Sequence, residues 1–221
     1  GKGALRSHSM STSERLQAML APASQARERA HKELVNGQKR GHWIWWVFPT
    51  LTARGGDMFS AMQRPAADLS DVAFATAYAE HQELRRALTL SFETAATSFA
   101  ACAKRGEDKA PWRVLDAGFG RRADGAWIQG PVDSFKLFCS ATLFAAIAHR
   151  EGHADLKRSA LSVLQHFTGD VVYSSKGEGS SGHYSDGEVR NVLKGHDDVT
   201  LKLAGVTDWQ KIVAGTDHSE L

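Results

Sequence analysis

Residues 39–49 read Lys-Arg-Gly-His-Trp-Ile-Trp-Trp-Val-Phe-Pro and contain three of the six tryptophans in this chain of 221 residues. Large aromatic side chains bury more area than any other kind, so this stretch must anchor a core or a pocket. Its apolar residues recur at helical spacing, and we expect a helix that ends at Pro49. On that helix Trp43 and Trp46 would be buried, and Trp45 would lie nearer the rim.

Helix signals recur along the rest of the chain. Ser11 and Glu14 have the spacing of a capping box, and the helix that they open should stop at Pro22. The clearest amphipathic pattern runs from Glu83 to Cys102. We expect further helices through Ala26–Leu34 with a stop at Asn36-Gly37, through Met58–Met62 after Asp57, through Val72–Tyr78 after Asp68 or Ser70, from Asp133 to Ile147, from about Asp155 to Phe167, from Ser185 to Leu193, and through Trp209–Ile212 after Thr207.

Strand signals are few. Only residues 170–173 and 199–203 combine β-branched residues in a strand-like run. The sequence therefore predicts an all-α fold, a single multi-helix domain with at most a minor strand pair near the C-terminus.

Composition narrows the functional class. The chain has 27 basic and 25 acidic residues and a net charge of +2, so there is no strong case for nucleic acid or for an anionic membrane as partner. Its two cysteines, Cys102 and Cys139, lie in apolar helical contexts, which is typical of a reducing, cytoplasmic location. No uncharged stretch is long enough to span a bilayer. Residues 1–9 resemble a vector-derived tail, and we interpret 10–221 as the domain.

Three motifs have simpler structural explanations. Residues 177–182 match G-x-G-x-x-G, but no suitable βαβ unit surrounds them, so we interpret the glycine-rich loop 174–182 as a mobile surface loop and predict no cofactor. His149 and His153 are four residues apart, but no third ligand is evident and we predict no metal site. Arg121-Arg122 is interpreted as a solvated basic turn.

The segment 133–144 mixes polar and apolar residues in an unusual way. Lys136 and Ser140 share one helical face, and Leu137, on another face, supplies part of the apolar side. Asp133 could cap the helix or pair with Lys136. Thr142 could bond back to its own helix.

Two of these stretches resemble a known family. Residues 37–49 are similar to the hallmark of the domain of unknown function 1810 family, and residues 133–144 resemble its second hallmark, Asp-x-x-Lys-Leu-x-x-Ser-x-Thr-Leu-Phe. The resemblance extends over roughly residues 16–167. It implies one all-helical domain with right-angled, solenoid-like helix packing, but it implies no activity. Relative to the family pattern, insertions are expected at about 104–126 and 170–195.

If the two hallmark stretches pack together, their polar residues form one constellation. Our leading hypothesis is a protein that binds or processes a small anionic molecule, nucleotide-like in one version, between the His-Trp stretch and the Asp-x-x-Lys helix. In an enzyme, His42 would be the acid or base and Asp133 its orienting partner or an electrostatic stabiliser. The alternative is a non-catalytic helical interaction module. The sequence leaves catalysis and oligomeric state open. The expected ligand-binding residues are Lys39, Arg40, Trp43, Trp46, Lys136, Ser140 and Thr142.

Overall fold

The structure is a computed structural model that describes residues 10–52, 69–106, 110–116, 132–167, 172–173, 190–191 and 195–214. Its helices are α1 (Thr12–Val35), α2 (Ile44–Val47), α4 (Val72–Glu80), α5 (Gln82–Lys104), α6 (Ala110–Leu115), α7 (Val132–Glu151), α8 (Ala154–Leu164), α9 (Asp198–Leu203) and α10 (Trp209–Val213). The strands β1 (Val172–Tyr173) and β2 (Arg190–Asn191) form an antiparallel pair. The predicted all-α class is confirmed.

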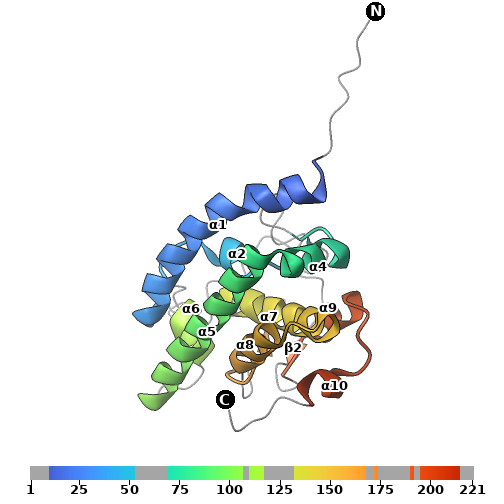
Figure 1. Ribbon diagram of the computed structural model, residues 1–221. Coiled ribbons are helices and arrows are strands. Elements are labelled where there is room, and N and C mark those ends of the chain that lie inside the picture. Colours follow the sequence, from blue (N-terminus) through green and yellow to red (C-terminus); the bar gives the residue numbers. More distant parts are fainter. Residues whose placement is uncertain are drawn as a thin grey trace, which may run out of the picture.

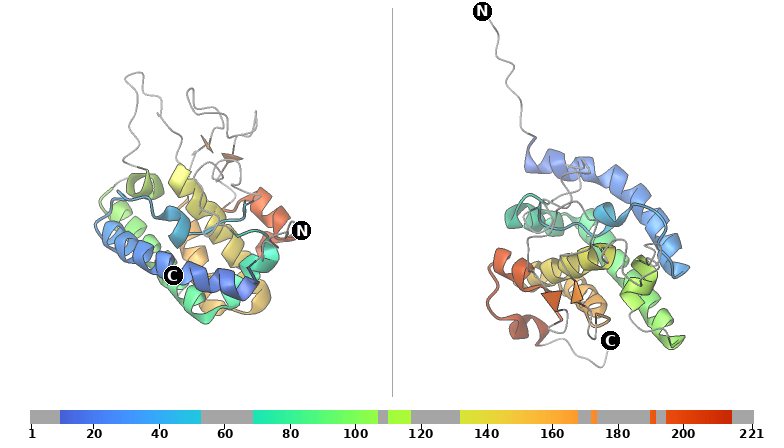
Figure 2. Two further views of the ribbon diagram at one scale, coloured as in Figure 1. Left: turned by 90° about the horizontal axis from the view of Figure 1, so that it is seen from above. Right: turned by 180° about the vertical axis from the view of Figure 1, so that it is seen from behind.

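Helices α5 and α7 organise the packing. Helix α5 packs against α1, α4, α6 and α8, whereas α7 packs against α2, α4, α6, α8, α9 and α10. Figures 1 and 2 show α1 along one side of the molecule and α9 and α10 on the opposite side, with α5, α7 and α8 between them. One hydrophobic core extends from Leu16 in α1 to Ile212 in α10. Right-angled, solenoid-like packing of these helices stays a prediction.

The first helix begins where the sequence predicted but does not stop at Pro22. Ser11 and Glu14 form the expected capping box, and α1 then continues through the proline to Val35. A proline inside a helix costs about 3 kcal/mol. The buried stripe that includes Met19, Ala23 and Ala30 runs across the proline and offsets this cost. Gly37 ends the segment with a φ of 70°, the left-handed conformation expected there.

The tryptophan stretch forms only one helical turn, α2. Trp43 precedes this turn and is buried, as predicted, but Trp45 is 9% exposed whereas Trp46 is only half-buried. The expected order of Trp45 and Trp46 was therefore wrong. A single helical turn is too short for apolar residues spaced three or four apart to determine which side chains are buried. Lys136 of α7 covers the Trp45 ring instead.

Several boundaries also differ from the sequence predictions. Residues 199–203 belong to α9 rather than to a strand, because the Asp197 side chain caps that helix. Residues 172–173 pair instead with β2, in a segment where a helix was expected. Helix α4 is capped by Asp71 and helix α10 by Asp208, each one residue or more after the expected cap. The predictions for residues 1–9, 53–68, 121–122 and 174–182 lie outside the described residues. None of the described helices is both long and apolar enough to cross a membrane.

Candidate functional site

The two hallmark stretches meet in a buried ionic cluster of Lys39, Asp133 and Lys136. Lys39 lies between α1 and α2, and the other two residues lie in the first turns of α7. Asp133 accepts from both lysines, with its Oδ2 atom 2.6 Å from Lys39 Nζ and its Oδ1 atom 3.0 Å from Lys136 Nζ. All three side chains are nearly inaccessible, and Lys136 is 4% exposed. Asp133 is thus the shared counter-ion of two lysines, and not the N-cap of α7, which begins at Val132.

A second carboxylate, Asp116, caps the same helix from outside. Its Oδ1 atom accepts from the backbone N–H of Asp133 at 3.0 Å, and its Oδ2 atom accepts from that of Ser134 at 3.1 Å. Burial, and then the nearby charge of Asp133, raise the pKa of Asp116 to about 7. Burial also lowers the pKa of Lys136 to about 8, although Asp133 opposes that change. The ionic cluster and Asp116 together place two lysines and two carboxylates in one buried environment.

Tryptophan rings form part of the wall around the lysines. Lys136 Nζ lies 3.2 Å from the centroid of the Trp45 ring, and Lys39 Nζ lies 5.3 Å from that of Trp43. Cations are attracted to the negative face of such rings. The Lys39 backbone N–H also donates to the carbonyl of Val114 at 2.7 Å, so α6 holds the stretch in place.

Glu33 of α1 fixes the turn that leads into α2. Its Oε2 atom accepts from Trp43 Nε1 at 2.7 Å, from the Arg40 N–H at 2.6 Å and from the Gly41 N–H at 2.9 Å. A Cβ atom on Gly41 would lie 2.8 Å from the Arg29 Cδ atom, so only glycine fits without a shift. Glu33 and Asp116 were not predicted from the sequence, because both act at a distance along the chain and belong to no local motif.

The remaining predicted site residues fall into different environments. Ser140, one turn after Lys136, is fully buried and its hydroxyl has no hydrogen-bond partner. Thr142 donates to the carbonyl of Phe138 at 2.9 Å and accepts from the Asp197 N–H at 3.2 Å, so it joins α7 to the start of α9. His42 and Arg40 are exposed. The pocket that His42 was expected to share with Lys136 is not supported by these exposures.

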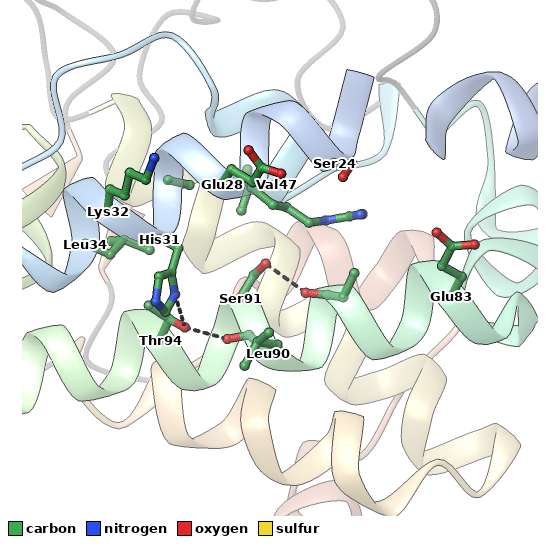
Figure 3. Close-up of a pocket in the computed structure, with 13 residues that line it drawn as sticks. Ser24, Glu28, His31, Lys32, Leu34, Val47, Glu83, Leu90, Ser91 and Thr94 are labelled. Atoms are coloured by element: carbon green, nitrogen blue, oxygen red, sulfur yellow. Dashed lines mark hydrogen bonds between the residues drawn. The ribbon is translucent and has the colours of Figure 1, made fainter. Parts of the chain in front are cut away.

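A cavity lies elsewhere, between α1 and α5, and Figure 3 shows it. We call it the α1–α5 cavity. It has a volume of about 580 Å³ and is lined mostly by apolar atoms. Its apolar side chains are Ala30, Leu34, Val47, Ala87 and Leu90, and of these Leu90 is 58% exposed. Val47 belongs to the tryptophan stretch, so that stretch contributes to this cavity as well as to the ionic cluster.

The charged residues of the α1–α5 cavity differ in burial. Glu28, His31, Lys32 and Glu83 are exposed, and in the view of Figure 3 Lys32 and Glu83 lie at opposite ends. Arg27 is half-buried. Its Nη2 atom donates to the hydroxyl of Tyr78 at 3.2 Å, whereas its enclosed Nε atom has no partner. Burial raises the pKa of Tyr78, which therefore stays protonated.

Two further cavities are more polar. One lies between α5 and α8, with a volume of about 330 Å³, and the other lies between the end of α7 and the segment from α9 to α10, with a volume of about 470 Å³. Neither these two cavities nor the α1–α5 cavity is lined by a member of the ionic cluster. Within the described part of the chain no group of three or more potential ligands could hold a metal ion. His153, one of the two histidines considered as metal ligands, contacts Glu80 instead, with 2.8 Å between its Nε2 atom and Glu80 Oε1.

The comparisons with known proteins find a family model that matches part of the chain, and nothing narrower. No curated protein and no solved structure matches the chain. The family match ends before α6 and therefore does not reach the second hallmark stretch in α7. Residues 13–105 match the model of the family described as "Protein of unknown function (DUF1810)", and over those residues the match confirms the family resemblance of the sequence.

Proposed function

We propose that this chain is a small-molecule-binding protein whose ligand lies in the α1–α5 cavity. The observation that carries the proposal is the cavity itself, which has a volume of about 580 Å³ and mostly apolar walls. Ligand sites typically enclose about 300–1,000 Å³ and combine apolar walls with a few polar groups. Leu90, which is 58% exposed at the edge of the cavity, would be covered by such a ligand.

The proposal moves the site away from the hallmark residues. Lys39 and Lys136 already share the carboxylate of Asp133, and both oxygens of that carboxylate are engaged. Buried pairs of this kind hold elements in register, and here they hold the tryptophan stretch on α7. Among the described residues that line the α1–α5 cavity there is no tryptophan, tyrosine or phenylalanine, so this lining favours a flexible apolar ligand over a flat, nucleotide-like ring.

The test is binding of an uncharged fluorescent probe, N-phenyl-1-naphthylamine. We expect saturable binding to the purified protein. Leu90→Gln should weaken it at least about tenfold, because a polar amide replaces an apolar contact worth about 1.4 kcal/mol or more. Leu203→Gln in α9 is the matched control, because Leu203 is also exposed and does not line the cavity. Equal affinities for the wild type and Leu90→Gln would place the probe elsewhere.

A second candidate site keeps the residues that the sequence singled out. Ser140 supports it, because a fully buried hydroxyl without a partner is unusual and often marks a bound water or ligand. In this version a small anion would bind near Lys136 and Ser140. Inorganic phosphate should then raise the thermal midpoint of the wild type and not that of Ser140→Ala; equal shifts in both proteins would remove this candidate.

We also propose a cytoplasmic location. Cys102 and Cys139 are both buried in the hydrophobic core, where cysteine packs as a small apolar residue, and this supports a reducing compartment. Finding the native protein outside the cytoplasm, in fractionated cells, would contradict it.

A further inference from the structure

We propose that the ligand of the α1–α5 cavity is an amphiphilic monoanion, an apolar chain that carries one carboxylate, and that Arg27 binds this carboxylate. The inference rests on the proposed function, since it names the chemical class of ligand for the same cavity. It adds a charged anchor to a cavity whose walls are mostly apolar.

Arg27 has a charge that its surroundings do not balance. The side chain is half-buried, and no carboxylate forms an ion pair with it among the residues that the structure describes. Its side chain donates a hydrogen bond to Tyr78, a neutral phenol. Burying an unpaired charge is costly, whereas a guanidinium group and a carboxylate form two parallel, charge-assisted hydrogen bonds. A ligand carboxylate would supply the missing acceptor.

The enclosed Nε atom of Arg27 is the second observation. It is buried without a hydrogen-bond partner, although guanidinium nitrogens almost always find one. Tyr78 is fully buried and holds the other end of the guanidinium group at Nη2. That contact restrains the planar guanidinium group of Arg27, which is therefore partly pre-organised to bind an anion.

The other charges of the cavity do not substitute for this partner. Glu28 and Glu83 are carboxylates but are exposed, so solvent screens them, and neither forms an ion pair with Arg27. Lys32 is exposed too and adds little. The two carboxylates outnumber Lys32, but all three groups are exposed and screened by solvent, so the half-buried Arg27 decides which ligand charge is favoured.

The bridge between His31 and Thr94 closes part of the space between the two helices. Thr94 Oγ1 donates to the carbonyl of Leu90 at 2.8 Å and lies 3.4 Å from His31 Nδ1. When the single hydroxyl hydrogen of Thr94 lies on the Leu90 carbonyl, the second contact is made by the His31 tautomer that carries a proton on Nδ1. Figure 3 shows this bridge across the cavity. His31 is therefore engaged with α5, which leaves Arg27 as the anchor for the ligand.

The test compares decanoate with decanol, which have the same chain length and differ in charge. Both are used below the concentration at which decanoate forms micelles, and each displaces N-phenyl-1-naphthylamine. In the wild type we expect decanoate to bind at least about tenfold more tightly than decanol. Arg27→Gln should abolish this preference, Arg27→Lys should keep part of it, and Lys202→Gln, which removes an exposed charge outside the cavity, should leave it unchanged.

The outcomes separate the inference from the proposed function. If the probe binds but decanoate has no advantage over decanol, the anionic anchor is wrong while the cavity remains a binding site. If the probe does not bind at all, both fail. If Arg27→Gln still binds the probe with the wild-type affinity, its cavity is intact. A lost preference for decanoate over decanol is then not caused by misfolding. Displacement only by an acidic amphipathic peptide, and by neither decyl compound, would overturn the small-molecule class.

Discussion

The ammonium group of Lys136 lies 3.2 Å from the centroid of the Trp45 ring. A long cationic side chain from α7 thus covers a tryptophan from the one-turn helix α2, and the carboxylate of Asp133 fixes the position of that cation at 3.0 Å. This contact explains why Trp45, rather than Trp46, is the more buried ring. It also makes the tryptophan stretch depend on a helix that comes almost a hundred residues later.

Trp45→Ala should therefore destabilise the protein more than Trp46→Ala. Truncating a large buried aromatic residue costs about 3–5 kcal/mol. Trp46 is half-buried, and we expect its loss to cost about 1–2 kcal/mol, in the ordinary range of point substitutions. The free energies of unfolding from denaturant titration would give both values. Equal losses at the two positions would contradict the assignment of Trp45 to the core.

Asp133→Asn should be among the most damaging polar substitutions. It removes the one carboxylate that pairs with both Lys39 and Lys136, and an uncompensated buried charge costs about 3–5 kcal/mol. Asp155→Asn is the control, because Asp155 pairs with Arg158 at the surface and its loss should cost far less. A triple variant, Lys39→Met, Asp133→Leu and Lys136→Met, should recover most of the loss. If Asp133→Asn leaves the free energy of unfolding unchanged, the two lysines do not need this carboxylate.

Asp116 should make stability depend on pH. Its pKa is about 7 in the folded protein and near 3.8 without burial, so the folded state holds the proton more tightly than the unfolded chain does. Asp116 therefore contributes stability below pH 3.8, and that contribution is lost as the pH rises through about 7. Asp116→Asn removes the titrating group. The difference in free energy of unfolding between the variant and the wild type should shift in favour of the variant as the pH rises from about 4 to about 7, and should stay constant above about pH 7. Urea titrations at several pH values would measure this difference. Parallel pH curves for the two proteins would argue against a raised pKa.

Much of the fold follows from local patterns. The buried residues of α5, from Leu84 to Cys102, recur at the spacing from which the helix was predicted, and the capping box at Ser11 opens α1 as expected. The strand predicted at residues 199–203 was wrong because helix capping and contacts with α7 outweigh the strand preference of these residues. Asp197 caps α9 by accepting from Thr200, and the Asp197 N–H is held in turn by Thr142 of α7.

The candidate site was harder to predict than the helices. The pairing of Asp133 with Lys136 could be anticipated from their spacing, but the pairing of Asp133 with Lys39 depends on how α2 and α7 pack. Asp116 lies in a segment that resembled an insertion, so nothing local indicated that it caps α7. Arg27 looks like an ordinary charged position on α1 until α5 packs beside it and the buried Tyr78 accepts its Nη2 hydrogen bond.

Gly41→Ala should disturb the turn before α2. The added methyl group would lie 2.8 Å from Arg29 Cδ, 3.0 Å from Trp43 Cδ1 and 3.1 Å from Glu33 Oε1. Arg29 can move, but the ring and the carboxylate are held by their own hydrogen bond of 2.7 Å. We expect a loss of about 1–3 kcal/mol, the range for overpacking. Glu33→Gln, which keeps the volume but weakens the three hydrogen bonds, should lower stability in the same denaturant titration; unchanged stability in both variants would mean that the turn is not fixed this way.

The fragment 10–106, which contains the whole family match, should not fold on its own. Lys39 would lose Asp133, its only recorded counter-ion among the described residues, and its backbone N–H would lose the carbonyl of Val114. Helix α5 would expose the face that packs against α8, including Phe99, which contacts Phe167 with ring centroids 6.5 Å apart. Exposing a buried aromatic face costs about 25 cal/mol for each Å² of apolar area, and a small domain is stable by only 5–15 kcal/mol. Circular dichroism of the fragment should show low helicity and no cooperative thermal transition, whereas residues 10–214 should show both. A cooperative transition in the fragment would mean that the matched segment is a domain by itself and that the ionic cluster joins two units instead of completing one.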